Sequence, residues 1–270
     1  MPRRLQRLDA ELVRRGLARS REHAVELITA GRVQVRGVLA AKPASGVDHD
    51  TAMRVIEDTD DPGYASRGGH KLAGALAAFP DINVSGRRCL DAGASTGGFT
   101  DVLLRSGAAE VVAVDVGYGQ LAWALRSDER VLVLDRTNVR TLTPEQIGGR
   151  VGLTVADLSF ISLGLVLPAL AACTKPDGDL LPMVKPQFEV GRERLGSGGV
   201  VRDPALRAEA VLAVSHAAAE LGWRAAGVVR SPLPGPAGNV EFFLWLRRSD
   251  RALIDDEQMT EIVTTAEEAP

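Results

Sequence analysis

The 270-residue sequence is poor in cysteine and aromatic residues, and it has no hydrophobic run long enough to cross a bilayer. Cys89 and Cys173 lie among apolar residues, outside any C-x-x-C or Cys/His cluster, so we expect buried, reduced thiols and neither a disulfide nor a zinc site. The longest apolar stretch, FISLGLVLPALAAC, has about 14 residues and contains a proline. The N-terminus has no apolar signal core. These absences predict a cytoplasmic protein that does not insert into membranes.

The charge is distributed unevenly behind a net value of −3. Residues 1–46 carry ten basic and four acidic side chains, whereas the rest of the chain carries 22 and 31. A basic module before an acidic body suggests that the first part binds nucleic acid, and a solvated basic surface without a partner is the alternative. The length and the ordinary globular composition predict two domains.

Residues 1–60 are expected to form a small domain of two short helices followed by strands. Asp9 can cap a helix that ends at Gly16, and Ser20 can cap a second helix that ends at Gly31. The segments RVQVRG and AMRVIED predict strands. This pattern resembles the S4 RNA-binding domain, which binds structured RNA through its helix pair with salt-dependent phosphate contacts. The arginines expected to contact RNA are Arg4, Arg14, Arg15, Arg19, Arg21, Arg32 and Arg36.

Residues 61–66, which include Pro62-Gly63, predict a linker before a larger domain over 67–270. In this domain strand-like and helix-like segments alternate, which predicts a mostly parallel sheet with helices on both faces. The last two strand-like segments, joined by SPLPGPAG, are expected to form a hairpin that completes the sheet. Ligands of such sheets bind beyond the carboxyl ends of the strands.

The stretch LDAGASTGGFT, residues 90–100, predicts a glycine turn between a strand and a helix. A dinucleotide-binding loop would need glycine in place of Ser95, and a P-loop would need lysine in place of Phe99. NAD, FAD and ATP are therefore disfavoured. The turn instead suits a cofactor that carries a nucleoside without phosphates, such as S-adenosylmethionine.

The same turn also matches G-x-S-x-G, the nucleophile elbow of a serine hydrolase, with Ser95 as the nucleophile. That activity requires a histidine later in the chain, and only His216 is available. His216 falls inside a helix predicted over 204–221, away from its apolar face. That face is predicted to consist of Leu206, Ala210, Ala213, Ala217 and Leu221. A serine hydrolase therefore remains only an alternative.

Acidic residues occur where the predicted strands end, at the edge of the sheet that binds ligands. Asp115 is placed to accept hydrogen bonds from the ribose hydroxyls of a cofactor, whereas Asp135 could simply cap the following helix. The residues expected to bind the cofactor are Asp91, Gly93, Ala94, Ser95, Thr96, Gly97, Gly98, Asp115 and Asp135.

Three further charged residues stand out by position. Lys185 directly follows an apolar strand and precedes Pro186, although a solvated lysine is the alternative. Glu241 interrupts the apolar run NVEFFLWL, where a carboxylate is costly unless it is paired or faces outward at an edge. Lys71 opens a helix-like stretch, and on pattern alone it is a surface lysine.

At these residues the sequence becomes similar to a known family. The ordered motifs SRGGHKL, DAGASTGGFTD, DVGYGQLAW, DLSFISL, VKPQFEVG, GGVVRDP and SPLPGPAGNVEFFLWL closely resemble the TlyA family of bacterial ribosomal RNA 2′-O-methyltransferases. The resemblance implies an α/β fold, with a Rossmann-like class I methyltransferase sheet of the FtsJ/RrmJ type behind an α+β S4 domain. It also implies a Lys-Asp-Lys-Glu tetrad at Lys71, Asp157, Lys185 and Glu241.

The resemblance further implies methyl transfer from S-adenosylmethionine to the ribose 2′-hydroxyl of cytidine in 16S and 23S rRNA, and a link to capreomycin susceptibility. Lys185 would act as a base or as a cation that stabilises the developing alkoxide. Asp157 and Glu241 would orient the lysines, and Lys71 would hold the ribose. We expect no metal, and a monomer is favoured. The alternatives are an RNA-binding module on a catalytically silent body and the Ser95 hydrolase.

Overall fold

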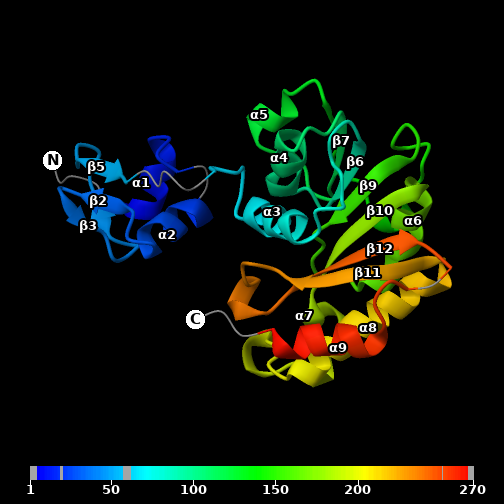
Figure 1. Ribbon diagram of the computed structural model, residues 1–270. Coiled ribbons are helices and arrows are strands. Elements are labelled where there is room, and N and C mark those ends of the chain that lie inside the picture. The colour runs from blue at the N-terminus through cyan, green and yellow to red at the C-terminus, as the bar shows by residue number, and fades with distance from the viewer. Residues whose placement is uncertain (1–4, 19–20, 57–61, 251, 267–270) are drawn as a thin grey trace. The chain divides into compact units, whose positions relative to one another are not determined.

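The computed structural model describes residues 5–18, 21–56, 62–250 and 252–266, and the chain divides into two compact units (Figure 1). The first unit covers residues 1–63 and the second covers 64–270. The division falls inside the stretch from 61 to 66 that the sequence marks as a linker. Each unit has a hydrophobic core of its own.

The first unit packs two helices against short antiparallel strands. Its elements are β1 (Gln6–Arg7), α1 (Leu8–Arg14), α2 (Arg21–Thr29), β2 (Val33–Val35), β3 (Val38–Leu39), β4 (Gly46–Val47) and β5 (Met53–Val55). Strand β2 pairs with β3 and β5, and β1 pairs with β4. Arg36 and Gly37 have positive φ angles of 52° and 80°, as a tight hairpin turn requires. Leu8, Leu12 and Ile28 are fully or almost fully buried in the small core.

The predicted helix caps of the first unit need one correction. Arg7, not Asp9, occupies the N-cap position of α1, and Asp9 lies in the first helical turn. There its carboxylate accepts a hydrogen bond from the backbone N–H of Ala10 and contacts arginine side chains. The pairing with arginine, which the local pattern does not reveal, determines its place. Ser20, the predicted cap of the second helix, lies outside the described residues.

The second unit is built on a seven-stranded sheet in the order β11-β12-β10-β9-β6-β7-β8. The strands are β6 (Arg88–Ala92), β7 (Glu110–Val114), β8 (Val131–Leu134), β9 (Val151–Ala156), β10 (Thr174–Val184), β11 (Trp223–Arg230) and β12 (Phe242–Arg248). Strand β12 runs antiparallel to β10 and β11, whereas the other neighbours are parallel. The predicted α/β fold with a C-terminal hairpin is confirmed.

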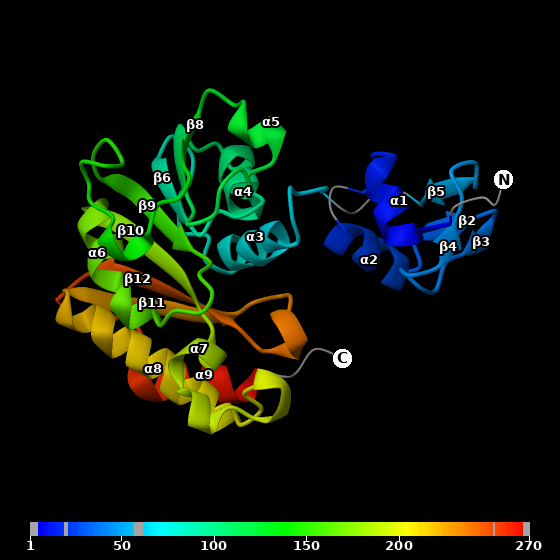
Figure 2. The same cartoon turned by 180° about the vertical axis from the view of Figure 1, so that it is seen from behind.

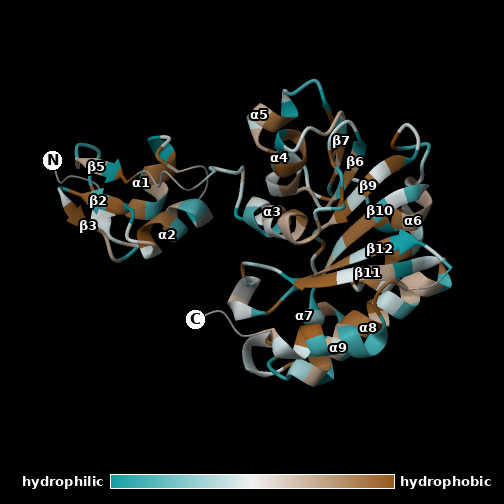
Figure 3. Cartoon of the chain, in the orientation of Figure 1, coloured by the Kyte–Doolittle hydropathy of each residue, from teal (hydrophilic) through white to brown (hydrophobic). Residues whose placement is uncertain are grey.

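Helices cover both faces of this sheet (Figures 1 and 2). They are α3 (Gly68–Ala78), α4 (Gly98–Arg105), α5 (Trp123–Arg126), α6 (Leu167–Cys173), α7 (Pro186–Glu189), α8 (Pro204–Glu220) and α9 (Asp256–Thr265). One apolar cluster joins the sheet to α6, α8 and α9, and the other joins it to α3, α4 and α5. Leu90 belongs to the first cluster and its neighbour Cys89 to the second, as alternation along a strand requires. Apolar residues accordingly concentrate on the central strands (Figure 3).

Helix α8 starts as predicted, and its buried face matches the predicted one in part. The Asp203 side chain accepts a hydrogen bond from Ala205 N and caps the helix, with Pro204 in the first turn. Its buried residues are Arg207, Ala208, Ala210, Val211, Val214, Ser215 and Ala218. Of the predicted apolar face, Ala210 is buried, Leu206, Ala217 and Leu221 are partly buried against the apolar clusters, and Ala213 is exposed. The helix is apolar on most sides, and its periodicity therefore did not select one face.

Candidate active site

The charged residues selected from the sequence gather where the strands of the second unit end. Asp91 is the second-last residue of β6, Asp115 follows β7 and Asp157 follows β9. Lys185 follows β10, and Glu241 directly precedes β12, which runs the other way. Because the carboxyl ends of parallel strands share one edge, these side chains line the same rim of the sheet.

The four tetrad residues form two ion pairs at this rim. Lys71 Nζ, on α3, lies 2.6 Å from Glu241 Oε2, and both side chains are at least nine-tenths buried. Lys185 Nζ lies 2.6 Å from Asp157 Oδ1, and the Asp157 side chain is 25% exposed. The first pair is therefore enclosed, whereas the second is open to solvent on the aspartate side. Lys71 is not the surface lysine that its local pattern favours.

Each pair has a further polar contact that sequence reasoning missed. Lys185 Nζ donates to Ser159 Oγ at 3.1 Å, and Gln187 Nε2 donates to Glu241 Oε1 at 3.2 Å. Gln187 is one of the buried residues of α7. Both residues lie inside the family motifs DLSFISL and VKPQFEVG, two residues from a tetrad member, but neither was singled out from the sequence.

The glycine turn lies directly against the loop that carries Asp157. Gly93 has a φ angle of 88°, and a Cβ atom there would lie 2.5 Å from the Asp157 carbonyl oxygen. Gly97 also has a positive φ angle, of 100°, and precedes α4. Glycine is needed at position 93 both for its backbone conformation and for this close approach.

The acidic residues near the turn have different surroundings. Asp115 accepts hydrogen bonds from the backbone N–H groups of Ser95, at 2.8 Å, and Gly117, at 2.7 Å. It thereby joins the glycine turn to the loop after β7. Asp135 pairs with Arg126 and accepts from Gly119 N at 3.3 Å, so it fixes that loop and does not cap a helix.

Asp91 is fully buried, and its two carboxylate oxygens differ. Oδ2 accepts a hydrogen bond from Thr100 Oγ1 at 2.7 Å, whereas Oδ1 has no hydrogen-bond partner among the described residues. Burial raises the pKa of Asp91 to about 7, and the neighbouring Asp157 and Asp115 carboxylates contribute to the rise. An unpartnered buried acceptor beside a glycine turn fits a ligand that brings its own donor, such as the ammonium group of S-adenosylmethionine.

The histidine required by the serine hydrolase alternative has another partner. His216 is exposed on α8, and its Nε2 lies 2.8 Å from Asp256 Oδ2 of α9. Ser95 lies in the turn before α4, which packs on the other face of the sheet. Within the described ranges, no group of three or more His, Cys, Asp or Glu residues could hold a metal ion. No described helix is long and apolar enough to cross a membrane.

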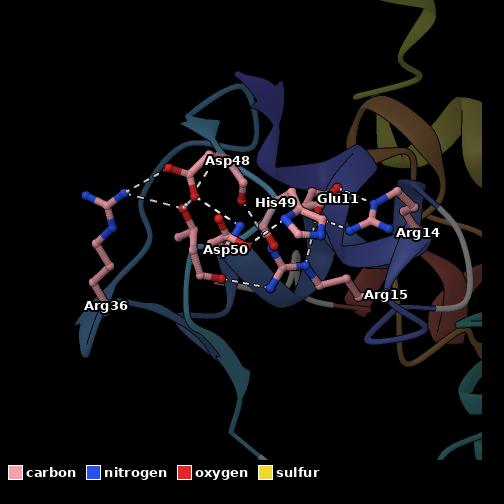
Figure 4. A network of polar contacts seen from close by, with 8 residues as sticks. Glu11, Arg14, Arg15, Arg36, Asp48, His49 and Asp50 are labelled. Carbon is pink, nitrogen blue, oxygen red and sulfur yellow. Dashed lines mark hydrogen bonds and ion pairs between the residues drawn. The ribbon is translucent and has the colours of Figure 1, made fainter. Parts of the chain in front are cut away.

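In the first unit, buried acids hold several of the arginines expected to contact RNA (Figure 4). Glu11 receives hydrogen bonds from Arg14 and Arg15, and these contacts lower the pKa of its carboxyl to about 2. Arg15 also donates to the backbone carbonyls of Asp48, His49 and Thr51 at 3.1, 2.6 and 2.7 Å.

The remaining arginines of this set are more exposed or lie elsewhere. The Arg21 side chain is 60% exposed and contacts Asp9 at 3.1 Å, and Arg36 is 70% exposed and lies 3.7 Å from Asp48. Arg32 Nε donates to the Ile56 carbonyl at 3.1 Å. Arg4 and Arg19 lie outside the described residues. Arg15 is thus the most enclosed of the described set for which an ion pair is present.

The fold and the site together define a methyltransferase of the FtsJ-like class, preceded by an RNA-binding module. Residues 64–248 match the FtsJ-like methyltransferase family, and residues 6–51 match the S4 domain. The chain belongs to the TlyA family: it is 66% identical to the 16S/23S rRNA (cytidine-2'-O)-methyltransferase TlyA of Mycobacterium tuberculosis over 92% of both chains.

Two further relatives show how far the similarity extends. The 23S rRNA (cytidine-2'-O)-methyltransferase TlyA of Campylobacter jejuni is 34% identical over 67% of this chain and 70% of that protein. A solved structure from Streptococcus thermophilus, which carries a hemolysin name, matches with a TM-score of 0.78 and 38% identity, covering 97% of this chain and 95% of the other. The family assignment made from the sequence motifs is confirmed.

Proposed function

We propose that this protein transfers a methyl group from S-adenosylmethionine to the ribose 2′-hydroxyl of cytidine in both 16S and 23S ribosomal RNA. The observation that carries the proposal is the pair of lysine–carboxylate contacts at the same rim as the glycine turn. The name of the 66% identical relative includes both rRNAs, whereas the 34% identical relative is named for 23S rRNA alone. The greater identity and coverage favour both targets for this chain.

The chemistry requires a poor nucleophile to be aligned with a methyl group and relieved of its proton. S-adenosylmethionine supplies the methyl group on a sulfonium: the 2′-oxygen bonds to the methyl carbon as the carbon–sulfur bond breaks, and the sulfur keeps that electron pair. Lys185 acts in one of two ways: as a neutral amine that accepts the 2′-hydroxyl proton, or as an ammonium that stabilises the oxygen while the proton passes to solvent. Asp157, 2.6 Å away, fixes the lysine. Lys71, held by Glu241, adds a second positive charge near the ribose.

The surrounding residues would hold the two substrates. Asp91 and the turn from Gly93 to Gly98 would bind the cofactor, and Asp115 would meet its ribose. Asp135 would support the loop after β7 through Arg126. The S4 domain would bind rRNA through its arginines. We infer that the protein works as a monomer in the cytoplasm, where ribosomal RNA is found, and that the reaction needs no metal.

The test incubates the purified protein with methyl-labelled S-adenosylmethionine and unmodified 30S or 50S subunits, then maps positions that resist alkaline cleavage. A 2′-O-methyl group blocks that cleavage, so label at resistant cytidines supports the proposal. Lys185→Ala should lower transfer at least about 100-fold while cofactor binding persists. The matched control is Lys175→Ala, which removes an exposed lysine of β10, the strand that ends just before Lys185.

Three other outcomes would contradict parts of the proposal. Label in only one subunit would restrict the substrate to that rRNA. Binding of RNA and cofactor without any transfer would favour a catalytically silent body. Ester hydrolysis that Ser95→Ala abolishes would favour the hydrolase.

A further inference from the structure

The short helix α7 contacts three parts of the rim with three alternate residues. Lys185, at its N-cap, reaches Asp157, and Gln187 reaches Glu241. Glu189 accepts hydrogen bonds from Ser162 Oγ at 2.6 Å and from Leu163 N at 2.8 Å, in the loop after β9. The two ion pairs are therefore joined through one four-residue helix.

Glu241 needs two donors because it is 1% exposed and both carboxylate oxygens are buried with it. Lys71 donates to Oε2 and Gln187 to Oε1. A Cβ atom at Gly235 would lie 2.1 Å from Oε1, so the backbone before β12 closes on this oxygen from another side. The amide of Gln187 thus supplies the second hydrogen bond to the Glu241 carboxylate without adding charge.

Gln187 is an expensive residue to bury for stability alone. Its Oε1 atom is buried and has no hydrogen-bond partner among the described residues. Such an acceptor destabilises the folded state, and an apolar side chain of similar shape would avoid that loss. Buried polar groups that are only half satisfied are expected mainly at functional sites.

We infer that Gln187 is a positioning residue that fixes Glu241, and through it Lys71, relative to Lys185. This inference rests on the proposed methyl transfer. Without the amide donor, the Glu241 carboxylate can rotate toward any other donor, and the Lys71 ammonium moves with it. The distance between the two ammonium groups is then no longer set by α7, and the second positive charge does not meet the reacting ribose.

The test compares Gln187→Met with Gln187→Glu in methyl transfer to ribosomal subunits. Gln187→Met keeps the length of the side chain and removes the donor, so kcat should fall about tenfold or more, as expected for a lost hydrogen bond to a charged group. The KM for RNA and the affinity for S-adenosylmethionine should stay within about twofold, because the residue reaches its target only through Glu241. Gln146→Met, on an exposed turn, is the control.

Gln187→Glu adds a pH signature. A protonated carboxyl at this position can donate to Glu241 as the amide does, whereas an ionised one repels it. The other charged groups at the rim, which include Lys71, Lys185, Asp91, Asp115, Asp157 and Glu189, are the same in both proteins, so their titration cancels in the ratio. The ratio of variant to wild-type kcat should therefore approach one at acidic pH and fall as pH rises.

The results separate this inference from the proposed function. A wild-type protein that transfers no methyl group overturns the proposed function. An active wild type together with variants that keep kcat within about twofold, or with a Gln187→Glu ratio independent of pH, overturns the positioning role. If Gln187→Met fails to fold, the pH dependence of the Gln187→Glu ratio decides alone.

Discussion

The buried acids of the first unit and the acids at the catalytic rim of the second unit have different partners. In the first unit, Asp9 and Glu11 each contact two arginines, and these contacts lower the pKa of both carboxyls to about 2. At the rim, each acid of the tetrad contacts one lysine, and no basic side chain of the described residues pairs with Asp91. Its pKa is raised to about 7 by burial.

The difference follows from what each base can do. An arginine fork binds a carboxylate through two parallel hydrogen bonds and has further donors for backbone carbonyls, so it fastens chain segments together. A lysine is a compact charge that one carboxylate can hold while it still faces a substrate. Arginine pairs thus hold the small unit together, whereas lysine pairs leave the catalytic rim reactive.

The largest effect is expected when a lysine of the catalytic rim is replaced by arginine, the base that pairs with acids in the first unit. Lys185→Arg keeps the positive charge, but its planar guanidinium should bind Asp157 through two hydrogen bonds and present no compact ammonium to the ribose. We expect kcat to fall at least about 100-fold. Single-turnover methyl transfer with excess enzyme measures the chemical step directly. Activity close to wild type would show that any cation suffices at this position.

The second effect concerns the buried acid without a basic partner. With a raised pKa, Asp91 keeps its proton in the folded state after the unfolded chain has lost it, so the free energy of unfolding falls as pH rises from about 4 to about 7 and is level above that. Asp91→Asn cannot ionise and should lack this part of the pH dependence. The Tm of the variant minus that of wild type should therefore be larger at pH 8 than at pH 5. A difference independent of pH contradicts the raised pKa of Asp91.

The smallest effect separates two arginines that contact the same acid. Arg15→Met removes one contact with Glu11 and the donors to three backbone carbonyls, whereas the contacts that Arg14→Met removes among the described residues are all with Glu11. Arg15→Met should lower the Tm of the first unit by a few degrees more than Arg14→Met. The contribution of Glu11 to the free energy of unfolding is fully present above the pKa that Glu11 has in the unfolded chain, and it is lost as pH falls toward about 2.

The same two arginine variants should differ in the opposite sense when RNA binding is measured. Arg14 is half exposed, so Arg14→Met should weaken RNA binding and reduce the slope of log K against log salt by about one. Folded Arg15→Met should leave that slope unchanged, because its guanidinium contacts backbone carbonyls. Equal slopes for the two variants would mean that both arginines play the same part in RNA binding.

The sequence predicted the sheet and its ligand-binding edge well because apolar strands followed by acidic residues form a local pattern. Lys71 was different: its helix-like context favoured a surface lysine, and only the resemblance to a family assigned it to the tetrad. Its contact with Glu241 joins residues 170 positions apart, which no local pattern encodes.

Other features depended on tertiary packing and could not be predicted. The arginines near Glu11 looked equivalent in the sequence, although Arg15 faces carbonyls from a distant loop and Arg14 faces solvent. The buried face of α8 was predicted only in part, because an alanine-rich helix offers several apolar faces and the sheet selects one. Gln187 was not singled out, although it lies in the family motif VKPQFEVG two residues after Lys185.

Because Gly93 lies so close to the Asp157 carbonyl, the glycine turn that would bind the cofactor packs directly against the loop that carries Asp157. Neither can be reshaped alone: a side chain added to the turn would push the loop that carries Asp157 and disturb its contact with Lys185. An effort to make this enzyme accept bulkier sulfonium donors would therefore have to enlarge the site elsewhere, for example along the exposed loop after β7. The backbone at position 93 thus sets the distance between the cofactor-binding turn and the loop that carries Asp157.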